Sequence, residues 1–324
     1  MRRLLLSRAA QAAVVIALVA TLAFVLIHLA PGDPFSGSLE DPSVSPEVRR
    51  TQRALWGFDR PLPEQYGHWV RNLARGEFGW SFSLFRPVGD VLRETVPHTL
   101  LLMGTALVAG LAAGLALGTW QASRGGSVAD RAAGTATLVV LSVPEFLVAL
   151  GAMALFGASL RWLPVGGMRD PALHESFGFL GRVLDVARHL ALPAGTLAAL
   201  TAAAVSRYHR AAMLAVLPED FVRTARAKGA SGRAVLWRHA LRNALGPAIT
   251  ISGLLLPALF GGAVFVEKIY AWPGMGMTMV NGVVGRDYPL VLAGVLVGSA
   301  LVAVGGAMAD VLAALVDPRV RSHG

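Results

Sequence analysis

The chain has 324 residues, of which 54% are hydrophobic and only 15% are charged. Soluble domains contain about 25% charged residues, so this composition excludes an ordinary soluble protein and predicts an integral membrane protein. The formal net charge of +9 is better explained by basic cytoplasmic loops than by nucleic-acid binding. The lack of cysteine excludes disulfide bonds and thiolate metal sites.

Six stretches are apolar for long enough to cross a bilayer, since about 20 helical residues span a hydrocarbon core of about 30 Å. The first is longer than the apolar region of a secretory signal peptide, so we expect an uncleaved span. Lipid offers backbone groups no hydrogen-bond partner, so the spans should be helical. The predicted fold is an all-α integral membrane protein with six transmembrane helices: Ala9–Leu29, Thr99–Trp120, Ala132–Leu160, Leu190–Ser206, Ala244–Val266 and Tyr288–Ala309.

The predicted spans divide the chain into three parts. Residues 1–30 hold the N-terminal span, residues 31–98 form a long external loop or subdomain, and residues 99–324 form a five-span core. In the external part, a surface helix from Glu64 to Phe78 is predicted, with one face formed by Tyr66, Trp69, Val70 and Leu73.

The later external segment from Glu267 to Asp287 contains a Trp-Pro-Gly turn. Its aromatic residues Tyr270 and Trp272 are predicted to lie at the membrane–water boundary.

The arginines indicate the orientation. They are dense at the N-terminus, between the second and third spans, and in residues 207–246 between the fourth and fifth spans. The long loop of residues 31–98 is also basic, but long loops translocate largely regardless of their charge. Both termini and residues 207–246 are therefore predicted to be cytoplasmic.

The cytoplasmic loop is predicted to begin with a short helix, with Asp220 as its N-cap and Gly229 at its C′ position. A helix of two turns is marginal alone in water, so its own domain or a partner must hold it. Helical spacing places Arg223 and Arg226 together, and it gathers a second face from Phe221, Thr224, Ala225 and Lys228.

In this arrangement Phe221, beside the small residues Thr224 and Ala225, can insert into a cleft of a partner. The arginines would then face an acidic rim of that cleft. After the short helix, a second one is predicted from Ser231 to Asn243, ending before the Gly246-Pro247 pair.

The segment RTARAKG, Arg223–Gly229, resembles the EAA motif of bacterial ABC importer permeases. With the RHALRNAL that follows, it looks like the dipeptide, oligopeptide and nickel branch of that family. The family motif is Glu-Ala-Ala, three residues, then Gly. Here Arg223, Thr224 and Ala225 take the first three places and Gly229 the fourth.

This chain departs from the general motif further on, where His239 replaces an apolar residue and Arg242 replaces a frequent proline. Both departures are usual in the peptide branch. The resemblance continues in order along nearly the whole chain, through PGDP, GFDRPLPEQY, SVPEF, RWLPVGG, HLALPAGTLAAL, FVEKIYAWPGMG, RDYPLV and DPRVR.

The resemblance implies a multi-pass permease subunit of an ATP-driven importer in the bacterial inner (plasma) membrane, for di- or oligopeptides. In that family the cytoplasmic loop forms a coupling helix that sits in a groove of an ATPase. The corresponding residues here are Phe221, Arg223, Thr224, Ala225, Arg226, Lys228 and Gly229.

The resemblance also implies the partners of this chain. They are a homologous second permease, two ATPase subunits that bind ATP and Mg, an external solute-binding protein and membrane lipids. We expect no cofactor, metal or nucleic acid on this chain itself.

Glu145 is the ionisable residue furthest from either end of a predicted span. An ionisable residue inside a membrane is a functional hypothesis by default. Glu145 is predicted to line the translocation path and to attract an amine or cation of the cargo. The alternative is that it faces a polar crevice beside a kink at Pro144, hydrogen-bonded or protonated.

Other classes fit less well. The chain has no G-x-x-x-x-G-K-[ST] pattern, so ATP hydrolysis is assigned to partners and the chain is not predicted to be an enzyme. An ion-coupled secondary transporter remains an alternative, but it should show inverted repeats and several buried charges. Import of nickel or another small solute is a second alternative, and the sequence leaves the cargo open.

Overall fold

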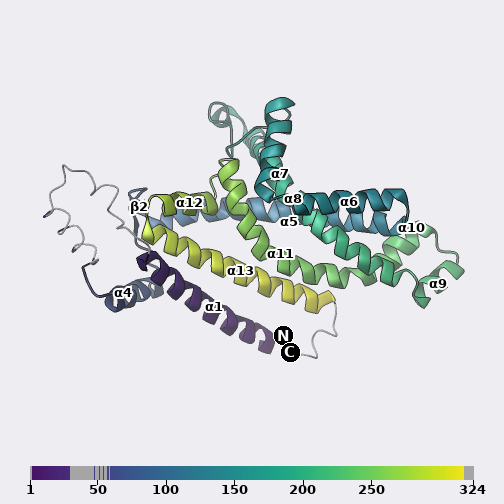
Figure 1. The fold of residues 1–324 in the computed structure, drawn as a ribbon, viewed down its shortest axis with the longest axis horizontal. Coiled ribbons are helices and arrows are strands. Elements are labelled where there is room, and N and C mark those ends of the chain that lie inside the picture. The colour runs from purple at the N-terminus through teal and green to yellow at the C-terminus, as the bar shows by residue number, and fades with distance from the viewer. Residues whose placement is uncertain are drawn as a thin grey trace.

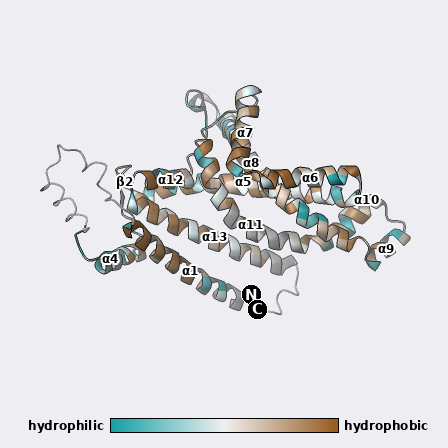
Figure 2. Ribbon diagram, viewed as in Figure 1, coloured by the Kyte–Doolittle hydropathy of each residue, from teal (hydrophilic) through white to brown (hydrophobic). Residues whose placement is uncertain are grey.

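The computed structural model describes residues 2–29 and 59–316, together with the isolated positions 47, 51, 54 and 57. Long helices run side by side in an elongated bundle, with α4 at one end and α9 at the other (Figure 1). A lobe that contains α7 stands out from the side of the bundle. Hydrophobic residues dominate α12 and α13, whereas polar residues gather at α4 and α9 (Figure 2).

The N-terminal helix α1 (Arg2–Leu29) packs against the helix that follows it. The helix predicted from Glu64 to Phe78 is α4 (Leu62–Ala74), which starts two residues earlier and ends four residues earlier. Its aromatic side chains contact α1: the Phe24 ring lies 5.5 Å from that of Trp69, and Thr21 Oγ1 lies 2.8 Å from the hydroxyl of Tyr66. Two short antiparallel strands follow, β1 (Trp80–Ser81) and β2 (Arg86–Pro87).

Two very long helices, α5 (Val88–Ser123) and α8 (Phe179–Val216), form the closest packing in the bundle. Three glycines of α5, four residues apart, make this possible. A Cβ on Gly110 would lie 2.6 Å from the Cβ of Thr201, and a Cβ on Gly114 would lie 2.7 Å from that of Val205. Small residues of this kind allow two membrane helices to approach closely. Gly118 continues the row against the backbone of Ser206.

The third predicted span, Ala132–Leu160, is not one straight helix. It is a pair bent by 105°, formed by α6 (Val128–Ser142), then α7 (Glu145–Ala152), which continues in the π-helical turn η1 (Met153–Ser159). Pro144 is the cause, because it has no N–H to donate and it disfavours helical geometry in the residue before it. Val143 is accordingly extended, with φ −83° and ψ 129°.

After the bend, a loop with the short 3-10 turn η2 (His174–Ser176) leads into α8. The loop of residues 207–246 contains α9 (Asp220–Ala227), α10 (Gly232–Ala234) and the π-helical turn η3 (Val235–Ala240). The remaining helices are α11 (Leu241–Ile269), α12 (Met275–Val284) and α13 (Tyr288–Val316).

The second short helix predicted from Ser231 to Asn243 does not end there. The chain is helical without interruption from Gly232 through η3 into α11, and it passes through the Gly246-Pro247 pair. Pro247 lies inside this continuous helix, where it removes one backbone donor. Membrane helices tolerate an interior proline because neighbouring helices and local helical adjustments satisfy the freed backbone groups. The loop of residues 207–246 and the fifth predicted span are therefore joined rigidly.

In the part of the chain that the structure describes, four helices are long and apolar enough to cross a membrane: Ser7–Leu29, Val88–Ser123, Phe179–Val216 and Tyr288–Ala309; counting the bent pair gives five. These segments cover the predicted first, second, fourth and sixth spans and extend the second and fourth at both ends. The fifth predicted span lies in α11, which has 29 residues and is about 43 Å long at 1.5 Å per residue. The chain is thus a multi-span helical membrane protein.

Candidate functional site

The short helix α9 begins and ends close to the predicted positions. Its N-cap is Glu219 and not Asp220, which is the first helical residue, and no side chain caps the N-terminus. At the other end Gly229 has φ +82°, a conformation that glycine adopts without strain. The N–H of Gly229 donates to Arg226 O and that of Ala230 to Ala225 O, which together form a Schellman motif.

One face of α9 is buried against its own chain. Val222 is fully buried and Ala225 is 8% exposed, and both pack with Val235 of η3. Ala225 is therefore the one member of the seven predicted coupling residues that lies on the inner side of the helix. This contact fixes α9 to the helical segment that continues into α11.

The opposite face of α9 is exposed. Phe221 is 41% exposed. The other exposed members of the predicted set are Arg223, Thr224, Arg226, Lys228 and Gly229. The ion pair of Arg223 with Asp220 is 3.4 Å long and solvent-exposed, so it contributes little to stability. The buried residues Val222 and Ala225 thus fix the helix so that the Phe221 ring and the basic side chains around it face solvent.

Glu145 lies at the bend between α6 and α7, as the first residue of α7. It borders a cavity of about 400 Å³ between the bend, α8 and α11. Its Oε2 atom lies against α11, where a Cβ on Gly262 would come within 2.5 Å of it. The structure therefore places Glu145 at a cavity wall formed by three elements, and not in the middle of a straight span.

The turn after α11 is a buried junction that the sequence reasoning missed. Tyr270 is 1% exposed and Trp272 is fully buried, so neither ring faces outward as an interfacial aromatic side chain would. Their location at the level of the membrane–water boundary stays a prediction. The Tyr270 hydroxyl donates to Ala149 O of α7 at 2.9 Å and lies 3.1 Å from Thr196 Oγ1 of α8. Trp272 Nε1 donates to His98 O of α5 at 3.0 Å.

The carboxylate of Glu267 completes this junction and is fully buried. It accepts hydrogen bonds from Thr99 Oγ1 at 2.6 Å and from the N–H of Met277 at 2.9 Å. Gly274 leaves room for it, since a Cβ there would clash with the carboxylate. The segment FVEKIYAWPGMG contributed to the family resemblance, but it gave no sign that the acid and both aromatic side chains turn inward.

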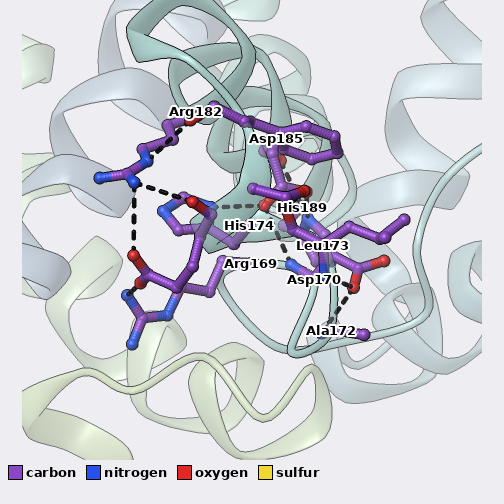
Figure 3. A network of polar contacts seen from close by, with 11 residues as sticks. Arg169, Asp170, Ala172, Leu173, His174, Arg182, Asp185 and His189 are labelled. Carbon is purple, nitrogen blue, oxygen red and sulfur yellow. Dashed lines mark hydrogen bonds and ion pairs between the residues drawn. The ribbon is translucent and has the colours of Figure 1, made fainter.

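A second polar network orders the loop between η1 and α8. Asp185 accepts from the N–H of Asp170 at 3.0 Å and lies 2.7 Å from His174 Nδ1 and 3.1 Å from His189 Nδ1 (Figure 3). Arg182 reaches back to Glu175 O at 3.0 Å. Within the described residues no group of three or more acidic or histidine side chains could hold a metal ion. The bonds of Asp185 to Asp170 and His174 tie the loop to α8.

Comparison with protein families gives two matches that together cover almost the whole chain. Residues 110–322 match the binding-protein-dependent transport system inner membrane component, and residues 1–103 match its N-terminal part. The chain belongs to this family of transport permeases. The family resemblance read from the EAA-type motif is thereby confirmed.

Curated relatives agree with the family. The Bacillus subtilis oligopeptide transport system permease protein AppB is 38% identical over 300 residues, which is 92% of this chain and 93% of that protein. The Pseudomonas aeruginosa di/tripeptide transport system permease protein DppB is 38% identical over 94% of both chains. A Brucella ovis protein named as a peptide permease is 39% identical over 93% of both chains.

A solved structure of an amino acid ABC transporter aligns with a TM-score of 0.46 and 15% identity, over 71% of this permease and 94% of that chain. This similarity is too low to add to the description of the fold.

Proposed function

We propose that this chain is the transmembrane subunit of an ATP-driven importer for di- and oligopeptides. Family membership and relatives named for peptide transport support this proposal. The observation that carries it is α9, which presents Phe221 and a ring of basic residues outward while Val222 and Ala225 anchor it inward. A helix built in this way suits docking into an acidic groove of an ATPase.

The proposed topology has six spans, with the bent α6–α7 pair as the third and α11 as the fifth. Both termini and α9 then lie in the cytoplasm, where an ATPase is available. The proposed assembly contains this chain, a homologous second permease, two ATPases that bind ATP and Mg, and an external solute-binding protein. In this arrangement the chain forms part of the path, and the partners supply energy and cargo.

The continuity of the helix from Gly232 to Ile269 suggests how docking is coupled to transport. At one end η3 packs against α9 through Val235 and Val222. Further along, Gly262 contacts Glu145, and beyond Ile269 the turn at Tyr270 bonds to α7 and α8. A shift of α9 with the ATPase would therefore move the wall of the Glu145 cavity, as expected for a switch between two states.

Replacement of Gly229 tests the proposal. Gly229→Val forces a β-branched residue into positive φ, whereas Gly229→Asn is tolerated there, and no neighbour lies within 4 Å of the new Cβ in either case. We expect ATP-dependent uptake of labelled trialanine to be lost in the valine variant and largely kept in the asparagine variant. Normal uptake with valine would refute the coupling role. Failure of the wild-type assembly to import any of a mixed set of tripeptides would refute the peptide cargo.

A further inference from the structure

The cavity at the bend between α6 and α7 has the dimensions of a ligand pocket. Its volume of about 400 Å³ lies within the range of about 300–1,000 Å³ that is typical of small-molecule sites. The walls come from α6, α7, α8 and α11, and they are mostly aliphatic: Leu141, Leu197, Leu200, Leu255 and Leu259. Glu145 is the one charged residue among the described residues that line it.

The carboxylate of Glu145 has no hydrogen-bond or ion-pair partner among the residues that the structure describes. Two hydroxyl groups line the same cavity, but both already donate to their own helices. Ser142 Oγ donates to Leu138 O at 2.8 Å, and Thr201 Oγ1 donates to Leu197 O at 2.9 Å. Neither hydroxyl proton is therefore available to the acid.

The surroundings nevertheless favour an acid at this place. Glu145 is in the first turn of α7, where the positive end of the helix dipole stabilises a negative charge. Gly262 gives the carboxylate its space on α11, because any side chain there would displace it. A carboxylate among leucine side chains is costly unless a cation pairs with it, so the missing partner should come from outside the chain.

We propose that Glu145 and this cavity form a subsite for a primary ammonium group of the cargo, an inference that rests on the proposed peptide import. An ammonium group supplies the positive charge and the hydrogen-bond donors that the carboxylate lacks. Every unmodified peptide carries one at its N-terminus, and lysine side chains carry another. The leucine walls accept the aliphatic part of the same residue, and an anionic group is repelled.

Uptake by the full importer tests the subsite and distinguishes the two sources of the ammonium group. The variants are Glu145→Gln, which keeps the shape, and Glu175→Gln as a control at an exposed carboxylate of the neighbouring loop. The cargoes are trialanine and Ala-Lys-Ala. We expect Glu145→Gln to raise the KM for uptake about tenfold, a change of about 1.4 kcal/mol, and the control to leave it unchanged.

An equal rise for both peptides assigns the subsite to the N-terminal ammonium group, and a rise for Ala-Lys-Ala alone assigns it to the lysine side chain. An unchanged KM for both peptides in a wild-type assembly that imports them would overturn the subsite and leave the proposed function standing. If the wild type imports neither peptide, the proposed function fails instead.

Chemical cross-linking provides a second test, and it uses the wild-type protein, so it does not depend on the folding of a variant. A water-soluble carbodiimide activates a carboxylate, and a neighbouring amine then displaces the urea to form an amide. In the purified importer with Ala-Lys-Ala, we expect mass spectrometry to find the peptide joined to Glu145, and excess N-acetylated peptide without lysine not to compete. Amide formation between Glu145 and a lysine of another subunit, or none at Glu145, would contradict the proposal.

Discussion

The two ends of the continuous helix from Gly232 to Ile269 differ in how far the residues around them are buried. At the Gly232 end, α9 is held by a few small apolar contacts, and most of its side chains face solvent. At the other end, Glu267, Tyr270 and Trp272 are almost completely buried, and each is hydrogen-bonded to another element.

The difference indicates what each end is for. Residues that hold a chain to itself are buried and paired, whereas residues kept for a partner stay exposed until the partner covers them. The junction at Tyr270 is complete within this chain. The outer face of α9 is not complete within this chain, because the exposed ring of Phe221 becomes buried only if another molecule covers it.

Replacing one glutamate at each end tests this contrast most strongly. Glu267→Ala leaves the Thr99 hydroxyl and the Met277 N–H buried without an acceptor, at a cost of about 1–3 kcal/mol each. Glu219→Ala removes an exposed side chain that makes no capping bond and should change stability by less than about 0.5 kcal/mol. Thermal unfolding in detergent should show a large fall in Tm for the first variant only. Equal Tm values for Glu267→Ala and Glu219→Ala would show that the two ends do not differ in this way.

A smaller effect is expected at Tyr270. Tyr270→Phe keeps the ring and removes the hydroxyl that bonds Ala149 O and lies beside Thr196, so stability should fall by about 1–2 kcal/mol. Tyr208→Phe is the matched control, since Tyr208 is 58% exposed on α8. If both variants unfold at the wild-type Tm, the hydroxyl does not tie α7 to α8.

The sequence predicted the features that depend on local pattern. The long apolar runs led to the spans, and Gly229 led to the end of α9, because only a few residue types adopt positive φ easily. The third span was predicted as one stretch, and a kink at Pro144 appeared only in the alternative interpretation of Glu145. The sequence did not give the 105° bend, after which α7 packs against α8 and α11.

The differences from the predictions arose where tertiary contacts override a local rule. Gly246-Pro247 looked like a helix end, but the helix continues through it. Tyr270 and Trp272 suited a membrane interface by residue type, yet backbone acceptors in α7 and α5 draw them inward. No periodicity in the sequence reveals such long-range partners.

The variant Phe221→Ala tests whether the exposed face of α9 receives the ATPase. Because Phe221 is 41% exposed, its removal should leave the Tm of the isolated chain unchanged. Val222→Ala, at a fully buried position, serves as the contrast and should lower the Tm. In the co-expressed assembly, the account predicts that Phe221→Ala reduces the ATPase that co-purifies with this chain by about tenfold or more. Full retention of the ATPase by Phe221→Ala would contradict it.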